Sequence, residues 1–190
     1  MLANKTRKHL TLLLICVLLA GLLAPVKAQP PQRVQQQVLT NGLKVLLVED
    51  HSFPVVSCFV WYKVGSRNEA PGMTGISHLV EHMLFHNVGN YRKGELGATI
   101  VRNGGQFNGF TSDDFTAFYE TVHPSKLDLM LRIESDRMRK ANFTSQDLKD
   151  ELVRINQDIE EQARDPQASL AREVRSTAFA QHPYRNPSIG

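Results

Sequence analysis

The chain contains very little cysteine, no internal repeat and only one long apolar run. Of its two cysteines, Cys16 lies inside that run, which leaves Cys58 alone in the rest of the chain. A single cysteine has no partner within the chain, so no intrachain disulfide is expected. Cys58 stands among apolar and β-branched residues, and this setting favours a core position over a nucleophilic role.

The one long apolar run lies at the start of the chain, at residues 10–23. It is short for a membrane span, which needs about 20 residues. Basic residues precede it and small residues follow it near Ala28, and this layout is typical of a secretory signal peptide. We therefore expect residues 1–28 to be a signal peptide, and the protein to be exported to the periplasm or the extracellular space without a stable membrane span after cleavage. An uncleaved N-terminal anchor is the alternative.

The chain lacks a large charge of either sign once this segment is set apart. The full sequence carries 22 Lys and Arg against 19 Asp and Glu, a net charge of +3. Four of the basic residues and none of the acidic ones lie in residues 1–28, so the remainder has 18 basic and 19 acidic residues. The positive charge therefore belongs to the export signal, and no nucleic-acid partner is expected.

The order of turn signals and apolar patterns predicts an α+β fold. Residues 29–37 are polar and proline-led, which is typical of a flexible lead-in, and residues 38–190 have the size of one domain. Asn41-Gly42 predicts a hairpin, and apolar stretches at 55–64 and 115–122 predict buried strands. Helices are predicted at four further places: over 94–102, after a cap at Ser125, after a capping box at 144–147, and after Asp165-Pro166. Strands first, with helices after and between them, indicate an α+β layer sandwich.

The candidate chemistry centres on His78, Glu81 and His82, which stand in the order His-x-x-Glu-His. On a helix the two histidines share one face, so both can bind one tetrahedral zinc ion. Glu81 can reach the same face, where a carboxylate can take a proton from zinc-bound water and return it to a leaving amine. The alternative is a chance placement of these residues on an ordinary helix.

Two flanking segments make the motif more specific. Residues 64–69 read VGSRNE, and residues 103–114 read NGGQFNGFTSDD. Together with His-x-x-Glu-His, they resemble the pitrilysin/insulinase family of zinc metallopeptidases, family M16, over residues 38–190. The resemblance implies a zinc-dependent metalloendopeptidase that hydrolyses peptides or small unfolded proteins. It also implies a mostly antiparallel sheet packed against helices.

The resemblance also suggests the remaining residues of the zinc site. Family members complete the site with a glutamate on a later helix, seven residues after another glutamate. The earlier acid matches Glu151, as a partner of a ligand histidine, and the ligand position falls on Asp158. Asp binds zinc through oxygen as Glu does, but is one methylene shorter. Glu161 is an alternative third ligand, a site with weak or no metal is another, and an ordinary solvated acid is the alternative for Glu151. For His86, a surface or structural role is preferred over a ligand role.

Substrate and partner expectations come from the same resemblance. It implies a substrate-binding edge at Phe107, Asn108 and Gly109, where a peptide adds to the sheet as a strand. Family members have two related halves that enclose the substrate, and this sequence resembles the first half, incomplete at its C-terminal end. Either the sequence is a fragment or a partner chain supplies the second half. The alternative function is a catalytically weak or inactive peptide-binding subunit that needs such a partner.

Overall fold

The computed structural model describes residues 33–190, so the predicted signal peptide and the start of the lead-in lie outside the described residues. The described residues belong to two compact units, one ending at Ser52 and the other spanning Phe53–Gly190. The predicted domain start at residue 38 falls inside the first unit. Over residues 33–190, no helix has both the length and the apolar character needed to cross a membrane.

The first unit contains a β-hairpin. Its strands β1 (Gln35–Val38) and β2 (Lys44–Leu47) pair antiparallel. The predicted turn is present. Asn41 Oδ1 accepts a hydrogen bond from the backbone N–H of Leu43 (3.1 Å), and Gly42 has a positive φ of 85°. The lead-in predicted for residues 29–37 is too long, because β1 begins at Gln35. Main-chain pairing with β2 orders these polar residues, and their polarity alone gave no sign of it.

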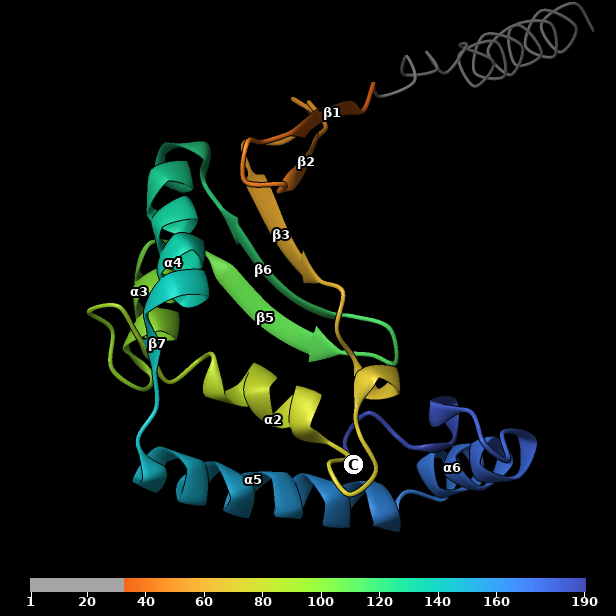
Figure 1. Cartoon of the computed structure of the whole chain (residues 1–190). Coiled ribbons are helices and arrows are strands. Elements are labelled where there is room, and N and C mark those ends of the chain that lie inside the picture. The colour runs from red at the N-terminus through yellow and green to blue at the C-terminus, as the bar shows by residue number, and fades with distance from the viewer. Residues whose placement is uncertain (1–32) are drawn as a thin grey trace, which may run out of the picture. The chain divides into compact units, whose positions relative to one another are not determined.

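The second unit is built on a three-stranded antiparallel sheet (Figure 1). Its strands, in the spatial order β3–β6–β5, are β3 (Val56–Tyr62), β6 (Thr116–Val122) and β5 (Gln106–Thr111). The central strand β6 places Tyr119 between Phe59 of β3 and Asn108 of β5. Within this sheet β5 is therefore an edge strand.

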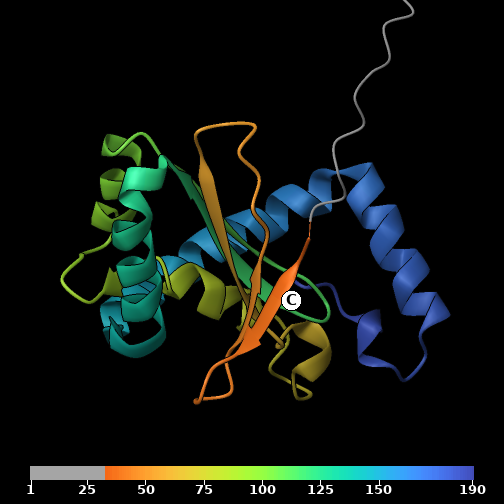
Figure 2. The same ribbon diagram turned by 90° about the horizontal axis from the view of Figure 1, so that it is seen from above.

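The second unit has five α-helices, three of which lie against one face of the sheet. They are α2 (Ile76–Met83), α3 (Glu95–Arg102), α4 (Leu127–Lys140), α5 (Ser145–Arg164) and α6 (Pro166–Ala178). Helices α2, α3 and α4 contact the strands, whereas α5 packs along α2 and leads into α6 (Figures 1 and 2). Two short paired strands, β4 (Asn87–Val88) and β7 (Ala141–Asn142), connect the end of the α2 region with the end of α4. The α+β class predicted from the sequence is confirmed.

The apolar core lies between the sheet and helices α3 and α4. Its buried cluster comprises Val88, Leu96, Ile100, Val122, Met130 and Ile133. Cys58 packs against this cluster, and burial raises the pKa of its thiol to about 11. The thiol is therefore protonated and unreactive at neutral pH, as expected for a core residue.

A buried ionic cluster joins this core to the end of α2. The guanidinium of Arg137 donates hydrogen bonds to Glu134 Oε1 (2.8 Å), Glu120 Oε1 (3.1 Å) and the carbonyl oxygen of Leu84 (2.8 Å). Burial, together with the neighbouring carboxylate of Glu134, raises the pKa of Glu120 to about 8, although Arg137 acts in the opposite direction. Glu120 is therefore mostly protonated at pH 7, which reduces the negative charge buried beside Arg137.

The N-terminal caps of the helices are those predicted from the sequence, with one exception. The capping box of α5 is present, with Thr144 Oγ1 accepting from Asp147 N, and Asp165 caps α6 with proline in its first turn. The predicted cap at Ser125 is wrong. A short 3₁₀ turn, Pro124–Lys126, precedes α4, and His123 Nδ1 accepts the hydrogen bond from Ser125 N (3.3 Å). Pro124 fixes the first backbone angle of this turn, so His123 takes the cap position.

The opposite face of the sheet carries exposed aromatic side chains. Strand alternation places Phe59, Trp61 and Phe110 on the face opposite the buried Phe118. Phe59 stacks on Tyr119 with ring centroids 5.0 Å apart. The exposed fraction is 49% for Phe59 and 54% for Trp61.

Candidate active site

The start of helix α2 is held by Glu69. Its carboxylate accepts hydrogen bonds from the backbone N–H groups of Gly75 and Ser77, both at 2.8 Å. N–H groups at a helix start have no partner inside the helix, and the helix dipole favours a negative charge there. Gly75 has a φ of 87°, and a Cβ atom at this position would lie 2.6 Å from the carbonyl oxygen of Ile189. The segment VGSRNE thus fixes where α2 begins.

His78 and His82 face each other one helical turn apart. Their Nε2 atoms are 3.1 Å apart and their ring centroids 4.4 Å. Two nitrogens that bind one tetrahedral zinc ion at 2.0–2.1 Å lie roughly 3.3 Å apart, so the observed separation fits a shared metal ion. Burial and the neighbouring His82 lower the pKa of His78, although Asp158, Glu151 and Glu69 act in the opposite direction. The neutral imidazole, which is the form that binds metal, is therefore favoured at neutral pH.

Glu81 points from the same helix toward strand β5. It is 6% exposed, and its Oε2 accepts a hydrogen bond from Thr111 Oγ1 (2.7 Å). Burial raises the pKa of Glu81, while the Thr111 hydroxyl and His82 oppose that rise. A Cβ atom at Gly109 would lie 3.0 Å from Glu81 Oε1, so the glycine leaves room for this carboxylate. No sequence pattern gave a sign of the contact between Thr111 and Glu81, which lie 30 residues apart.

Glu151 lies behind His82, on helix α5. Its Oε1 is 2.8 Å from His82 Nδ1, and its side chain is 2% exposed. Burial would raise the pKa of Glu151, but hydrogen bonds from His82 and His86 outweigh it and hold the pKa at about 2. The ionised carboxylate favours a proton on His82 Nδ1, which leaves the Nε2 lone pair directed toward His78.

Asp158 lies two turns after Glu151 on α5 and is half-buried. It is close enough to act on the pKa of His78. Across residues 33–190, however, no three His, Cys, Asp or Glu side chains are grouped closely enough to hold a metal ion. Glu161, the alternative ligand, is exposed. The assignment of Asp158 as the third ligand therefore stays a prediction.

The predicted substrate-binding residues lie on the edge strand β5 but point in different directions. The ring of Phe107 faces the helices, 5.8 Å from the ring of Phe85, and packs against the core cluster. Asn108 lies on the aromatic face, where its Oδ1 accepts a hydrogen bond from Gly109 N (2.9 Å). The Phe107 side chain thus serves packing, and any contact of this residue with a peptide would come from its backbone.

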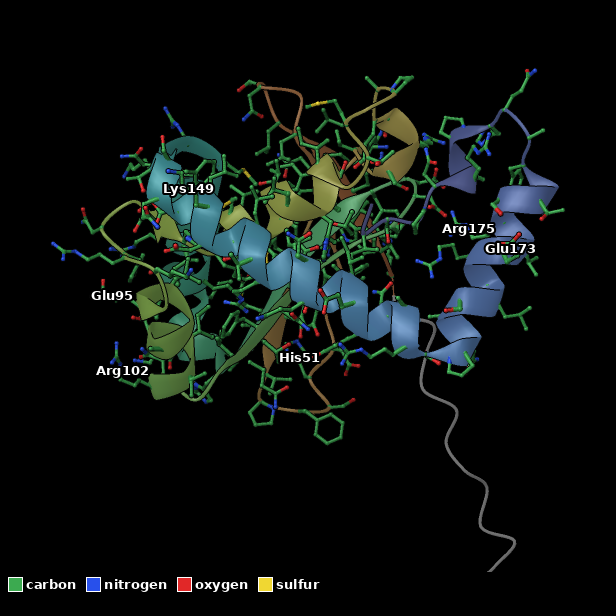
Figure 3. The ribbon with its side chains drawn as sticks, turned by 90° about the horizontal axis from the view of Figure 1, so that it is seen from below. His51, Glu95, Arg102, Lys149, Glu173 and Arg175 are labelled. Carbon is green, nitrogen blue, oxygen red and sulfur yellow. The ribbon has the colours of Figure 1, made fainter. Side chains whose placement is uncertain are left out.

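The β5–β6 turn is tied to the C-terminal segment beyond α5. Arg175 of α6, labelled in Figure 3, donates to Asp113 Oδ1 (2.6 Å) and to the carbonyl oxygen of Tyr184 (2.9 Å). Tyr184 donates its hydroxyl hydrogen to Asp114 Oδ1 (2.8 Å). Residues far apart in the sequence thus support the sheet end next to Thr111.

Known proteins are similar to this chain in sequence and in fold. The chain is 34% identical to "Zinc protease PqqE" of Helicobacter pylori over 181 residues, which cover 92% of this chain and 40% of that relative. It is 27% identical to "Uncharacterized zinc protease YmxG" of Bacillus subtilis, covering 83% of this chain and 38% of that relative. The crystal structure of a protease from Helicobacter pylori superposes with a TM-score of 0.81 at 30% identity, covering 84% of this chain and 39% of that one.

The chain therefore spans about two fifths of the length of these relatives. The sequence profile of the family described as "Insulinase (Peptidase family M16)" matches residues 44–190. That match covers most of the chain and includes the His-x-x-Glu-His helix, the edge strand β5 and helix α5. The chain belongs to the insulinase family of peptidases, family M16.

Proposed function

We propose that this chain is the zinc-binding part of a metalloendopeptidase that hydrolyses peptides or small unfolded proteins. The observation that carries the proposal is the facing pair of Nε2 atoms on His78 and His82, 3.1 Å apart, with the buried Glu81 on the same helix. Membership of family M16 supports it, as do relatives whose names describe zinc proteases.

In this proposal some residues bind the metal ion, and Glu81 transfers a proton. His78 and His82 would hold one zinc ion per chain through Nε2, with Asp158 as the proposed third ligand. Zinc bound there supplies a Lewis acid that polarises the substrate carbonyl and makes water a better nucleophile. Glu81, whose pKa is raised by burial, is suited to accept a proton from water and to return it to the leaving amine.

The edge strand β5 is the proposed substrate site. Main-chain N–H and C=O groups on the side of β5 away from β6 would pair with an extended peptide, whatever its sequence. Gly109 of β5 lies directly beside Glu81 of α2, so a peptide added to β5 would pass close to the proposed base. Asn108 would contact the peptide from the neighbouring position.

A second half and an exported location complete the proposal. The chain spans 40% of one relative and 38% of another, which supports a partner chain or a further part of the protein that encloses the substrate. The apolar run at 10–23 supports export to the periplasm or the extracellular space.

One observation favours the second candidate, a weak or inactive peptide-binding subunit. The described residues bring two histidines together, but no third ligand joins them. Under this alternative the edge strand would still bind peptides, and hydrolysis would be slow or absent.

Zinc content and one substitution test these functions. We expect close to one zinc per chain by elemental analysis, lost in His82→Ala and reduced in Asp158→Ala. Glu81→Gln should retain zinc and lower kcat for a fluorogenic peptide about 10²–10⁴-fold. Glu173→Gln, at an exposed position on α6 (Figure 3), is the matched control and should match the wild type. Zinc binding without hydrolysis in the wild type would favour the peptide-binding subunit. Hydrolysis unchanged in Glu81→Gln would exclude Glu81 as the base.

A further inference from the structure

His86 is a buried histidine outside the predicted zinc site. It lies in the turn that follows α2 and is 2% exposed. Its Nε2 is 2.6 Å from Oε2 of Glu151, which is shorter than the contacts of that carboxylate with His82, Lys93 and Arg154. A histidine this deeply buried and bonded is not a surface residue.

The two oxygens of Glu151 serve two different histidines. Oε1 faces His82 Nδ1 at 2.8 Å, and Oε2 faces His86 Nε2. A carboxylate can rotate about its last carbon–carbon bond, so fixing one oxygen fixes the direction of the other. Lys93 (3.4 Å) and Arg154 (3.6 Å) also approach Glu151, but their side chains are 41% and 62% exposed. Exposed contacts of this kind hold a partner weakly. His86 is thus the buried anchor of the carboxylate.

We propose that His86 is a positioning residue of the zinc site. It holds Glu151 in the orientation in which Oε1 accepts the hydrogen bond from His82 Nδ1, and His82 then directs its Nε2 lone pair toward His78. The expected effect on zinc binding rests on the proposed function. The hydrogen bonds that join His86, Glu151 and His82 do not rest on it, because they form between side chains of this chain without a metal ion. Changes to groups that orient a metal ligand typically cost 10–100-fold in metal affinity.

A simple packing role is the competing explanation. His86 fills space between the α2 region and α5, and its Nδ1 is buried without a hydrogen-bond partner in the described part of the chain. The nearest charged group on that side is Asp147 Oδ1, at 3.6 Å. A variant that keeps the volume but not the donor separates packing from hydrogen bonding.

The test uses His86→Leu and His86→Gln, with Zn²⁺ affinity measured by competition against a chelator of known affinity. Leu fills the site without a donor, and we expect a 10–100-fold weaker affinity. Gln can donate to the same oxygen and should recover most of the loss. His51→Leu is the control, because the His51 side chain is 91% exposed. Figure 3 labels its position. Wild-type affinity in His86→Leu, or equal losses in both His86 variants, would overturn the proposal.

A double-mutant cycle tests whether His86 acts through Glu151. In a Glu151→Gln background, His86→Leu should cause no further loss of zinc affinity. Additive losses would contradict action through Glu151. If the wild-type chain binds no zinc, the proposed function fails, and ¹⁵N NMR of the metal-free protein tests the positioning by itself. His82 should be protonated at Nδ1 in the wild type and become a mixture of tautomers in His86→Leu. An unchanged tautomer would overturn the inference.

Discussion

The ionisation of Glu81 depends on one hydroxyl group. Thr111 Oγ1 donates to Glu81 Oε2 at 2.7 Å, and this bond lowers a pKa that burial raises. Thr111→Val keeps the side-chain shape and removes the donor, so the pKa of Glu81 should rise further. The acidic limb of the kcat/KM profile should then move to higher pH, and activity should fall most at low pH.

The control for this substitution lies on the neighbouring strand. Thr121 of β6 bonds Ser57 (2.8 Å), away from Glu81. Thr121→Val should therefore leave the pH profile in place. A profile that does not move in Thr111→Val, or that moves equally in both variants, would contradict the role given to Thr111.

Local spacing made part of the site predictable from the sequence. His78, Glu81 and His82 share one helix, so four residues of spacing decide which face they occupy. The contact of Thr111 with Glu81 spans 30 residues and depends on how β5 packs beside α2. His86 shows a further limit, since its partner is an acid 65 residues later and no local pattern reveals that pairing.

Helix α5 depends on the capping box at its start. Thr144 Oγ1 accepts from Asp147 N (3.1 Å), and the Asp147 carboxylate accepts from Thr144 N (2.8 Å). Loss of a cap of this kind costs about 1 kcal/mol, so Thr144→Ala should lower the free energy of unfolding by roughly that amount. Urea unfolding measures it.

Thr177→Ala is the matched control for this prediction. Thr177 is exposed inside α6, where alanine is the better helix former, so its replacement should be neutral or slightly stabilising. Equal effects at both positions would show that the cap contributes nothing.

Among the elements, those with local signals were predicted best. The Asn41-Gly42 turn, the cap of α5 and the proline start of α6 each depend on residues within four positions of one another. The start of β1 was missed because pairing with β2, rather than apolar character, makes it a strand. The cap before α4 was missed because a histidine side chain took a place that serine usually fills.

The stability of the whole molecule should depend on pH through Glu120. Its pKa is about 8 in the folded protein, against an ordinary value of 4.5. The folded protein keeps a proton that the unfolded chain releases, so the stabilisation is complete below about pH 4.5 and is lost as the pH rises through about 8. Each pH unit between the two pKa values lowers the free energy of unfolding by about 1.4 kcal/mol at most, because Glu120 lies in an ionic cluster.

Glu120→Gln mimics the protonated carboxyl and should remove this pH dependence. Urea unfolding from about pH 5 to 8 should show the wild type losing stability relative to the variant as the pH rises. Glu173→Gln should follow the wild type throughout. Parallel curves for wild type and Glu120→Gln would mean that Glu120 is ionised in the folded state.

At the scale of the whole molecule, the sequence predicted the class and the family but not the packing that forms the site. Both the α+β class and family M16 follow from short motifs in a fixed order. The site itself depends on α5 lying along α2, which brings Glu151 to His82 across 69 residues. That contact arises from tertiary packing, and the same packing decides the distance from Asp158 to the histidines.

Trp61 gives the protein a built-in optical reporter. It is the single tryptophan of the chain, it stands on the aromatic face of the sheet, and 54% of it is exposed. Its ring lies 4.7 Å from that of Phe115, near the β5–β6 turn. All tryptophan fluorescence therefore comes from one position, whose emission wavelength depends on the water around the indole. Any molecule that covers this face would displace that water and shift the emission to the blue, so association can be followed without a label.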